Sequence, residues 1–284
     1  MTASRVLQEI ERLDPDRDFE RICFLGTNFD FPWDVEQSLE LAFFKTYAVP
    51  SISALLERTG EFQRRGQKRF DDTRLILAQM LDHGLASERS KTAVRSMNRM
   101  HGRYEIANED YLYVLSALMM EPLRWNTRFG WRRYVEKEKV AHFKFWREIG
   151  RRMGIRDLPE TLAEAERFNV DYEREQFRFA HSNRVVADAT MRIFLSWYPP
   201  PLRPLVALFI CSLLDRPVLD AFHYRLPPPL VRGIVLGALG LRARLLRHLP
   251  RRRRAHLLTS SRTRTYPSGY RVQELGVLPG RERD

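Results

Sequence analysis

The side chain with the clearest chemical potential in this sequence is His101, which lies in the segment AVRSMNRMHGRYEIANEDYLY. Val94, Met97 and His101 recur at the three- and four-residue steps of one helical face, so the imidazole should point toward an apolar interior. Two interpretations follow. A neutral core histidine needs a partner for each ring nitrogen, which the protein itself can supply. A histidine presented from a helix into an apolar all-α pocket also suits an axial ligand of haem iron.

A second candidate pair, Arg69 and Thr73, lies upstream in the segment KRFDDTRLILAQMLDHG. Residues four apart share one helical face. The arginine fork fits a carboxylate such as a haem propionate, and the threonine adds a small hydroxyl that can face a ligand. The same letters also fit an ordinary helix start, with Asp71 or Asp72 as the N-cap. Spacing alone does not choose between these interpretations.

Motifs of several other enzyme classes are absent from the sequence. It contains no GxxxxGK[ST] phosphate loop, no GxGxxG, no GxSxG elbow and no HExxH. A carboxylate-bridged di-iron bundle needs two Glu-x-x-His pairs. Only Asp220 and His223 have that spacing, and Glu138 and His142 are one residue further apart. Hydrolase, kinase and di-iron functions are therefore disfavoured.

The order of five segments resembles the superfamily of MpaB-type oxygenases and latex-clearing proteins, which are rubber oxygenases. The segments are Arg69-x-x-x-Thr73, DHG, MNRMHGRY, EDYLYVLSAL and WRRYVEKEKVAHFKFWREIGRRMGI, and the similarity covers roughly residues 45–195. This resemblance implies an all-α fold that binds haem b. It implies His101 as the proximal ligand of the iron, with Arg69 and Thr73 lining the pocket as cofactor-binding and catalytic residues.

The same resemblance implies an activity. Rubber-cleaving members use dioxygen to cleave the double bonds of an isoprenoid chain, and MpaB-type members are membrane-associated oxygenases of prenyl side chains. We therefore expect a haem b-dependent oxygenase of an apolar, alkene- or prenyl-bearing small molecule or lipid. Rubber-cleaving members have a lysine just before the threonine, where this chain has Asp72, so no distal ligand is assigned. Glu57 or Glu61 could act as a general base.

The alternative function is non-catalytic. The chain could be a haem-binding protein without turnover, or a helical protein that interacts with a membrane surface. Absorbance separates these possibilities, because an oxygenase or a haem carrier has a Soret band and a scaffold does not.

Helical periodicity predicts the elements that must position these residues. We expect helices over residues 33–47, 71–83, 87–101, 108–120 and 131–153, then one after Pro159 and one over 181–197. No run of alternating β-branched residues indicates a strand. The sequence therefore predicts a single all-α domain of about eight to ten helices that encloses an apolar haem pocket. Its expected parts are a helical segment (1–44), an oxygenase-like catalytic domain (45–224) and an apolar, then arginine-rich segment (225–284).

The net charge of +12 is concentrated at the carboxyl end. Residues 225–284 carry 14 arginines and three acidic residues, which leaves residues 1–224 with a net charge of +1. This distribution argues against a nucleic-acid-binding domain and for a local contact. An apolar run over 230–241, too short to span a membrane, precedes seven arginines between positions 242 and 254. It predicts a peripheral contact with an anionic membrane; a solvated helix end with a disordered tail is the alternative.

The first residues and the cysteines bear on location. The amino terminus is charged and has no apolar h-region, so no secretory signal is visible. Cys23 and Cys211 are the two cysteines, and they cannot form a disulfide framework or a cysteine-based zinc site. We therefore expect a cytoplasmic protein, peripherally membrane-associated, that is not secreted.

Overall fold

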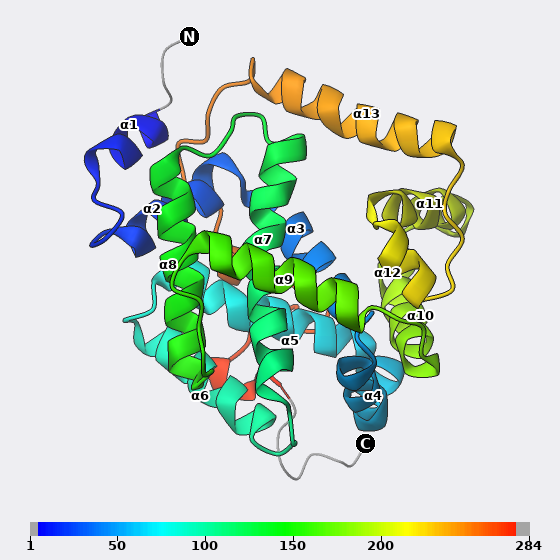
Figure 1. The fold of residues 1–284 in the computed structure, drawn as a ribbon. Coiled ribbons are helices and arrows are strands. Elements are labelled where there is room, and N and C mark those ends of the chain that lie inside the picture. The colour runs from blue at the N-terminus through cyan, green and yellow to red at the C-terminus, as the bar shows by residue number, and fades with distance from the viewer. Residues whose placement is uncertain (1–4, 277–284) are drawn as a thin grey trace.

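The computed structural model describes residues 5–276, and helices make up the regular structure of that range (Figure 1). Its thirteen α-helices confirm the expected all-α class and exceed the expected eight to ten, because several are short. They are α1 (Arg5–Arg12), α2 (Phe19–Leu25), α3 (Pro32–Thr46), α4 (Pro50–Thr59), α5 (Glu61–His83), α6 (Glu88–His101), α7 (Asn108–Phe129), α8 (Glu136–Met153), α9 (Leu162–Gln176), α10 (His181–Ser196), α11 (Arg203–Leu213), α12 (Arg216–Ala221) and α13 (Pro229–Leu246).

Helix α7 lies at the centre of the fold, where it packs against α3, α8 and α9. The main hydrophobic core is formed by the inward faces of α3, α5, α7 and α8 and includes Leu75, Tyr113 and Trp146. A second core joins the end of α3 to α10 and α12 through Phe44, Phe194 and other apolar side chains. These two cores flank the helices that carry the candidate residues.

Three helix boundaries differ from the expected ones. Helix α8 begins at Glu136 rather than at residue 131. Helix α7 was expected to end before Pro122, but it continues through this proline to Phe129. Proline removes one helical hydrogen bond; packing of α7 on its neighbours outweighs that loss. Helix α5 begins at Glu61 rather than near residue 71, and its backbone is non-helical at Arg65 (φ −137°, ψ 41°). The long helix α5 therefore contains a break four residues before Arg69.

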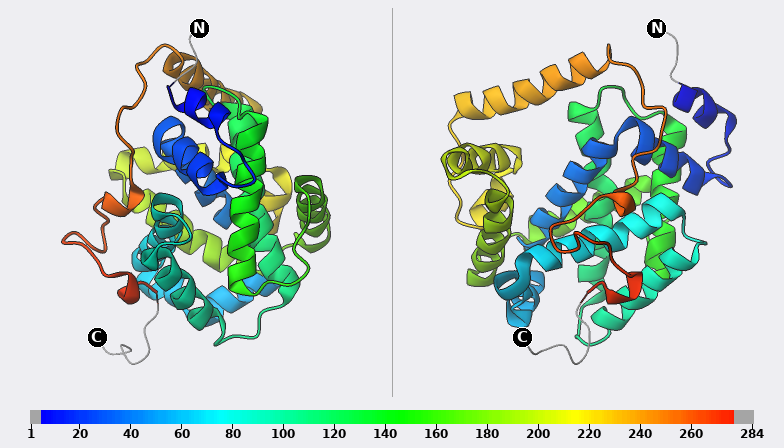
Figure 2. Two further views of the ribbon diagram at one scale, coloured as in Figure 1. Left: turned by 90° about the vertical axis from the view of Figure 1, so that its left-hand side faces the viewer. Right: turned by 180° about the vertical axis from the view of Figure 1, so that it is seen from behind.

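The chain beyond α13 returns along the body of the molecule (Figure 2). We call residues 256–276 the C-terminal strap. Its start is fixed by the amide of His256, which donates a 2.8 Å hydrogen bond to the carbonyl of Asn28. Two 3₁₀ turns in the strap, Leu258–Ser260 and Val272–Glu274, pack on α5 and α6 respectively. Residues 256–276 are thus docked on the helices, which contradicts the alternative of a disordered tail for this described part of the segment.

Within residues 5–276, no single helix combines the length and apolar composition needed to cross a membrane. One bent pair, α3 with α4, meets the criterion when the two helices are taken together, with an angle of 95° between them.

Candidate functional site

A cavity of about 1140 Å³ lies between α3, α5, α6, α7 and α8. Most of its deep wall is apolar, with Phe43, Leu77, Leu118, Trp146 and Ile149 among the lining side chains. Ligand pockets in proteins typically measure about 300–1,000 Å³ and are mainly apolar with a few polar groups. The cavity is therefore large enough for a bulky apolar ligand.

His101 is the last residue of α6 and lines this cavity. The helix starts at Ser87, whose hydroxyl accepts a 3.1 Å hydrogen bond from the Ser90 amide, as the sequence indicated. The ring of Tyr111 packs edge-on against the imidazole, with centroids 5.4 Å apart. The Nδ1 atom of His101 is buried and has no hydrogen-bond partner in the described residues. The interpretation of a core histidine requires a partner for each ring nitrogen, and Nδ1 has none among the described residues.

The surroundings of His101 keep its imidazole neutral. Burial, together with the positive charge of Arg69, lowers the pKa of His101 to about 4. At neutral pH the ring therefore carries one proton and one free lone pair, which is the form that binds metal ions.

Arg69 and Thr73 line the same cavity from α5. The Arg69 guanidinium donates a hydrogen bond to the Thr73 hydroxyl, which donates to the Arg69 carbonyl at 2.9 Å. The guanidinium also lies over the Phe62 ring, 5.6 Å from its centroid. Among residues 5–276 no carboxylate forms an ion pair with Arg69. The cavity wall therefore holds a cation with donors available for an anionic group.

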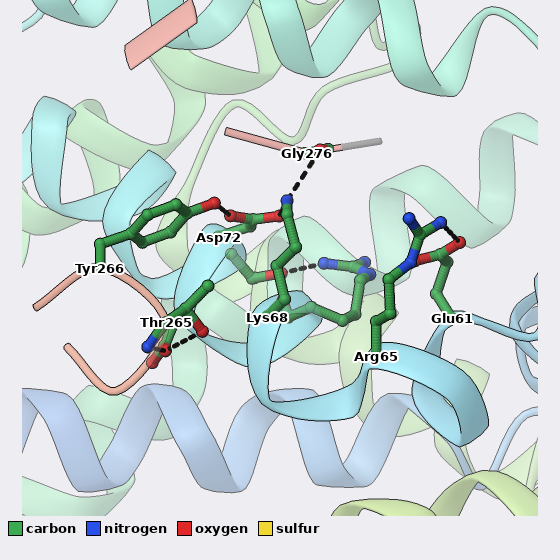
Figure 3. A network of polar contacts seen from close by, with 10 residues as sticks. Glu61, Arg65, Lys68, Asp72, Thr265, Tyr266 and Gly276 are labelled. Atoms are coloured by element: carbon green, nitrogen blue, oxygen red, sulfur yellow. Dashed lines mark hydrogen bonds and ion pairs between the residues drawn. The ribbon is translucent and has the colours of Figure 1, made fainter. Parts of the chain in front are cut away.

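Asp71 and Asp72 are not helix caps, so the interpretation of a helix start is wrong. Both lie inside α5, are buried, and bind the strap (Figure 3). The Asp72 carboxylate accepts 2.5 Å hydrogen bonds from the Tyr266 hydroxyl and the Lys68 ammonium group. Asp71 accepts from the amide and hydroxyl of Thr265, at 2.9 and 2.5 Å.

The two glutamates considered as general bases occupy different places. Glu61 lines the cavity and forms an ion pair with Arg65 at 2.7 Å, which is drawn in Figure 3. Glu57 is not among the residues that line the cavity.

The sequence analysis missed Glu40, which also lines the cavity. Burial, and secondarily the negative charge of Glu36, raises the pKa of Glu40 to about 8. Glu36 itself is paired with Arg74 at 2.5 Å. Glu40 is therefore a carboxyl group that holds its proton at neutral pH. The four-residue spacing of the two glutamates on α3 was the only available signal, and it does not reveal the cavity.

The described residues contain no group of three or more His, Cys, Asp or Glu side chains that could hold a metal ion. His101 stands as a single imidazole on the cavity wall rather than as a member of such a cluster.

Comparison with known proteins relates this chain to oxygenases. A family described as "ER-bound oxygenase mpaB/B'/Rubber oxygenase, catalytic domain" matches residues 42–265, a range that includes Arg69, Thr73 and His101. The chain is 28% identical to the ER-bound oxygenase mpaB' of Penicillium brevicompactum over 250 residues, covering 82% of this chain and 59% of the relative.

Two further relatives have similar identity. The ER-bound oxygenase mpaB of Penicillium roqueforti (strain FM164) is 27% identical over 69% of this chain and 72% of its own length. The ER-bound oxygenase mpaB of Penicillium brevicompactum is 28% identical over 70% of this chain and 55% of its own length. The chain thus spans less than two thirds of two of these three relatives.

Proposed function

The chain belongs to the family of mpaB-type and rubber oxygenases, and on this premise we propose that it is a haem b-dependent oxygenase. Its proposed substrate is an apolar, alkene- or prenyl-bearing small molecule or lipid, which it oxidises with dioxygen. The observation that carries this proposal is the meeting of His101 and Arg69 on one apolar cavity. There a neutral imidazole and an arginine without a carboxylate partner face the same space.

The residues present fit a haem. His101 would ligate the iron, and Arg69 would bind a propionate carboxylate through its fork of donors. Apolar lining residues such as Leu118 and Ile149 would help to hold the macrocycle. A bound haem would supply the activation of dioxygen, which side chains alone do not provide.

The chain itself would bind and orient the substrate and exclude water from it. Side chains such as Phe43 and Leu77 present an apolar surface to an alkene. The Thr73 hydroxyl donates to the Arg69 carbonyl and accepts from the Arg69 guanidinium, which fixes its orientation on the cavity wall. Glu40 is a half-buried carboxyl on the cavity wall that holds a proton at neutral pH and could deliver it into the cavity.

A pyridine-haemochrome assay on protein expressed with added haem precursor tests the cofactor. We expect about one haem per chain and a Soret band. Oxygen uptake with a prenylated phenol then tests the activity. A Soret band without oxygen uptake would favour a non-catalytic haem-binding protein. Colourless protein from haem-replete cells would overturn the haem proposal.

We also propose a peripheral contact with an anionic membrane through α13 and α11. Large apolar side chains on these helices face outward, and Leu230 and Leu205 are 76% and 64% exposed. Ile234, Leu241 and Leu245 continue this surface along α13. An apolar helix face of this kind can lie at the boundary between lipid headgroups and acyl chains.

Only part of the arginine cluster is available for lipid. Arg242 pairs with Asp34 at 2.9 Å, Arg247 donates to the Trp131 carbonyl, and Arg251 lies 3.5 Å from the centroid of the Trp131 ring. Arg244 and residues 252–254 remain exposed. These arginines would supply the electrostatic attraction, at about 1 kcal/mol for each residue near the surface.

A further inference from the structure

The turn of α5 that follows the break at Arg65 carries two sets of side chains. Arg69 and Thr73 line the cavity, Lys68 and Asp71 bind the C-terminal strap, and Asp72 does both. An α-helix turns by about 100° per residue. The strap-binding residues Lys68, Asp71 and Asp72 are therefore centred well over 90° around the helix axis from the midpoint of Arg69 and Thr73. Rotation of this turn would therefore move both sets together.

The strap supplies neutral donors to two buried carboxylates. Asp71 and Asp72 are each 3% exposed. Thr265 donates to Asp71 through its amide and hydroxyl, and Tyr266 donates to Asp72 through its hydroxyl. These partners are 194 residues apart in the chain. Rotation of the turn away from the strap would leave Asp71 only its donor Gln67 and Asp72 only its donor Lys68, both on α5. A buried carboxylate that loses donors is destabilised, so this rotation is resisted.

The strap is fastened on both sides of this contact. Lys68 donates to the Gly276 carbonyl at 3.1 Å, as Figure 3 shows, and Gln79 donates to the Tyr270 hydroxyl at 2.8 Å. Leu258 and Gly276 themselves line the cavity. The break at Arg65 removes helical continuity with the first turn of α5. The strap is thus a major restraint on the turn that begins after the break.

We propose that Thr265 and Tyr266 are positioning residues, which hold Asp71 and Asp72 and thereby keep Arg69 and Thr73 turned into the cavity. This inference rests on the proposed function only where it assigns Arg69 and Thr73 a role in binding a ligand in the cavity. The restraint itself is a property of the chain without cofactor.

The test compares the double variant Thr265→Val/Tyr266→Phe with the wild-type chain. Both substitutions keep side-chain shape and remove only hydroxyl donors. Hydrogen exchange, followed by mass spectrometry, reports the stability of residues 66–73. Fluorescence titration with anilinonaphthalene sulfonate, an apolar anion, reports the cavity and its arginine. We expect exchange about tenfold faster and dye binding about tenfold weaker, the order of magnitude for losing one or two hydrogen bonds to charged groups.

Two further variants control the test. Tyr270→Phe removes a strap hydroxyl that binds Gln79, two turns further along α5; residues 66–73 and dye binding should stay as in the wild type. The single variant Thr265→Ser keeps the hydroxyl donor and the wild-type Tyr266. Its hydrogen exchange at residues 66–73 and its dye binding should therefore match those of the wild type. Unchanged exchange in the double variant, or faster exchange with unchanged dye binding, would overturn the proposal. Neither measurement uses haem, so a failed haem assay leaves this test intact.

Discussion

Arg69 lies close enough to His101 for its positive charge to add to burial in holding the pKa of the imidazole at about 4. One residue comes from α5 and the other from the end of α6, and both face the same cavity. The pair combines a neutral nitrogen ligand with a cation whose donors have no carboxylate partner in the described chain. These two properties lead to the first two predictions.

Replacing His101 with alanine should abolish stoichiometric haem binding, because the variant loses the proposed axial ligand. The half-buried side chain makes no hydrogen bond through Nδ1, so helical circular dichroism should stay close to that of the wild type. The pyridine-haemochrome assay measures the loss. Full haem retention with an unchanged spectrum would contradict the assignment.

Arg69→Leu and Thr73→Val should separate two roles. Loss of the guanidinium should weaken haem binding by roughly tenfold or more, the effect of removing a charge-assisted hydrogen bond. Thr73→Val keeps the shape and removes the hydroxyl, so it should change oxygen uptake more than haem content. If both variants match the wild type in haem content and turnover, the pair is structural only.

His142→Gln should reduce the pH dependence of stability. His142 bonds to the Met119 carbonyl at 2.9 Å, and burial lowers its pKa to about 4. Because the unfolded histidine, with a pKa of about 6.5, binds a proton first, stability is full above that pH and falls as pH drops toward 4. One such group contributes at most about 1.4 kcal/mol per pH unit. Urea unfolding between about pH 7 and pH 5 measures this slope, and an equal slope in the variant would refute the prediction.

Lys45→Met should destabilise the fold by about 3–5 kcal/mol, because it leaves buried carboxylates without their cation. The Lys45 ammonium group lies 2.9 Å from both Glu121 and Glu173, and its side chain is 5% exposed. Arg21→Met is the matched control, since the Arg21–Glu9 pair lies at the surface and should cost less than about 1 kcal/mol. Urea unfolding compares the two variants. Similar losses of unfolding free energy in both variants would show that the buried Lys45 ion pairs stabilise the fold no more than the surface Arg21–Glu9 pair.

Ile234→Asn/Leu241→Asn should weaken binding to anionic vesicles by about tenfold or more, because two exposed apolar side chains of α13 are lost. Val170→Asn on α9 changes an apolar side chain that is 47% exposed elsewhere and should leave binding unchanged. Vesicle co-sedimentation measures both. Wild-type binding should also weaken as salt rises, since exposed charges are screened over about 8 Å at physiological ionic strength. Binding that does not depend on lipid charge or on salt concentration would contradict the proposed contact of α13 with an anionic membrane.

The parts of the fold that follow from local periodicity could be predicted from sequence. Ser87 begins α6 and the Val94, Met97 and His101 face points inward, because both features depend on residues within a few helical turns. Arg69 and Thr73 share the cavity face of α5 for the same reason. The roles of these three residues remain predictions.

The parts that depend on long-range contacts could not be predicted. Asp71 and Asp72 look like helix caps in sequence, and only the strap, almost two hundred residues later, explains their burial. Irregular backbone has no periodicity from which such a contact could be recognised. Pro122 similarly suggests a helix end, but the neighbouring helices keep α7 continuous through it. Nothing in the sequence around Glu40 indicates that its side chain lines a cavity.

Helix α13 lies at one end of the molecule, whereas the start of α5 and the turn between α6 and α7, which carry the exposed rim of the cavity, lie at the other (Figures 1 and 2). The exposed residues that line the cavity include Arg64, near the start of α5, and Tyr104, in the turn between α6 and α7. A protein resting on a bilayer through α13 would therefore present this rim to the aqueous phase. Its substrate would have to desorb from the lipid before capture, which favours amphiphiles with a measurable rate of exchange into water over fully apolar chains.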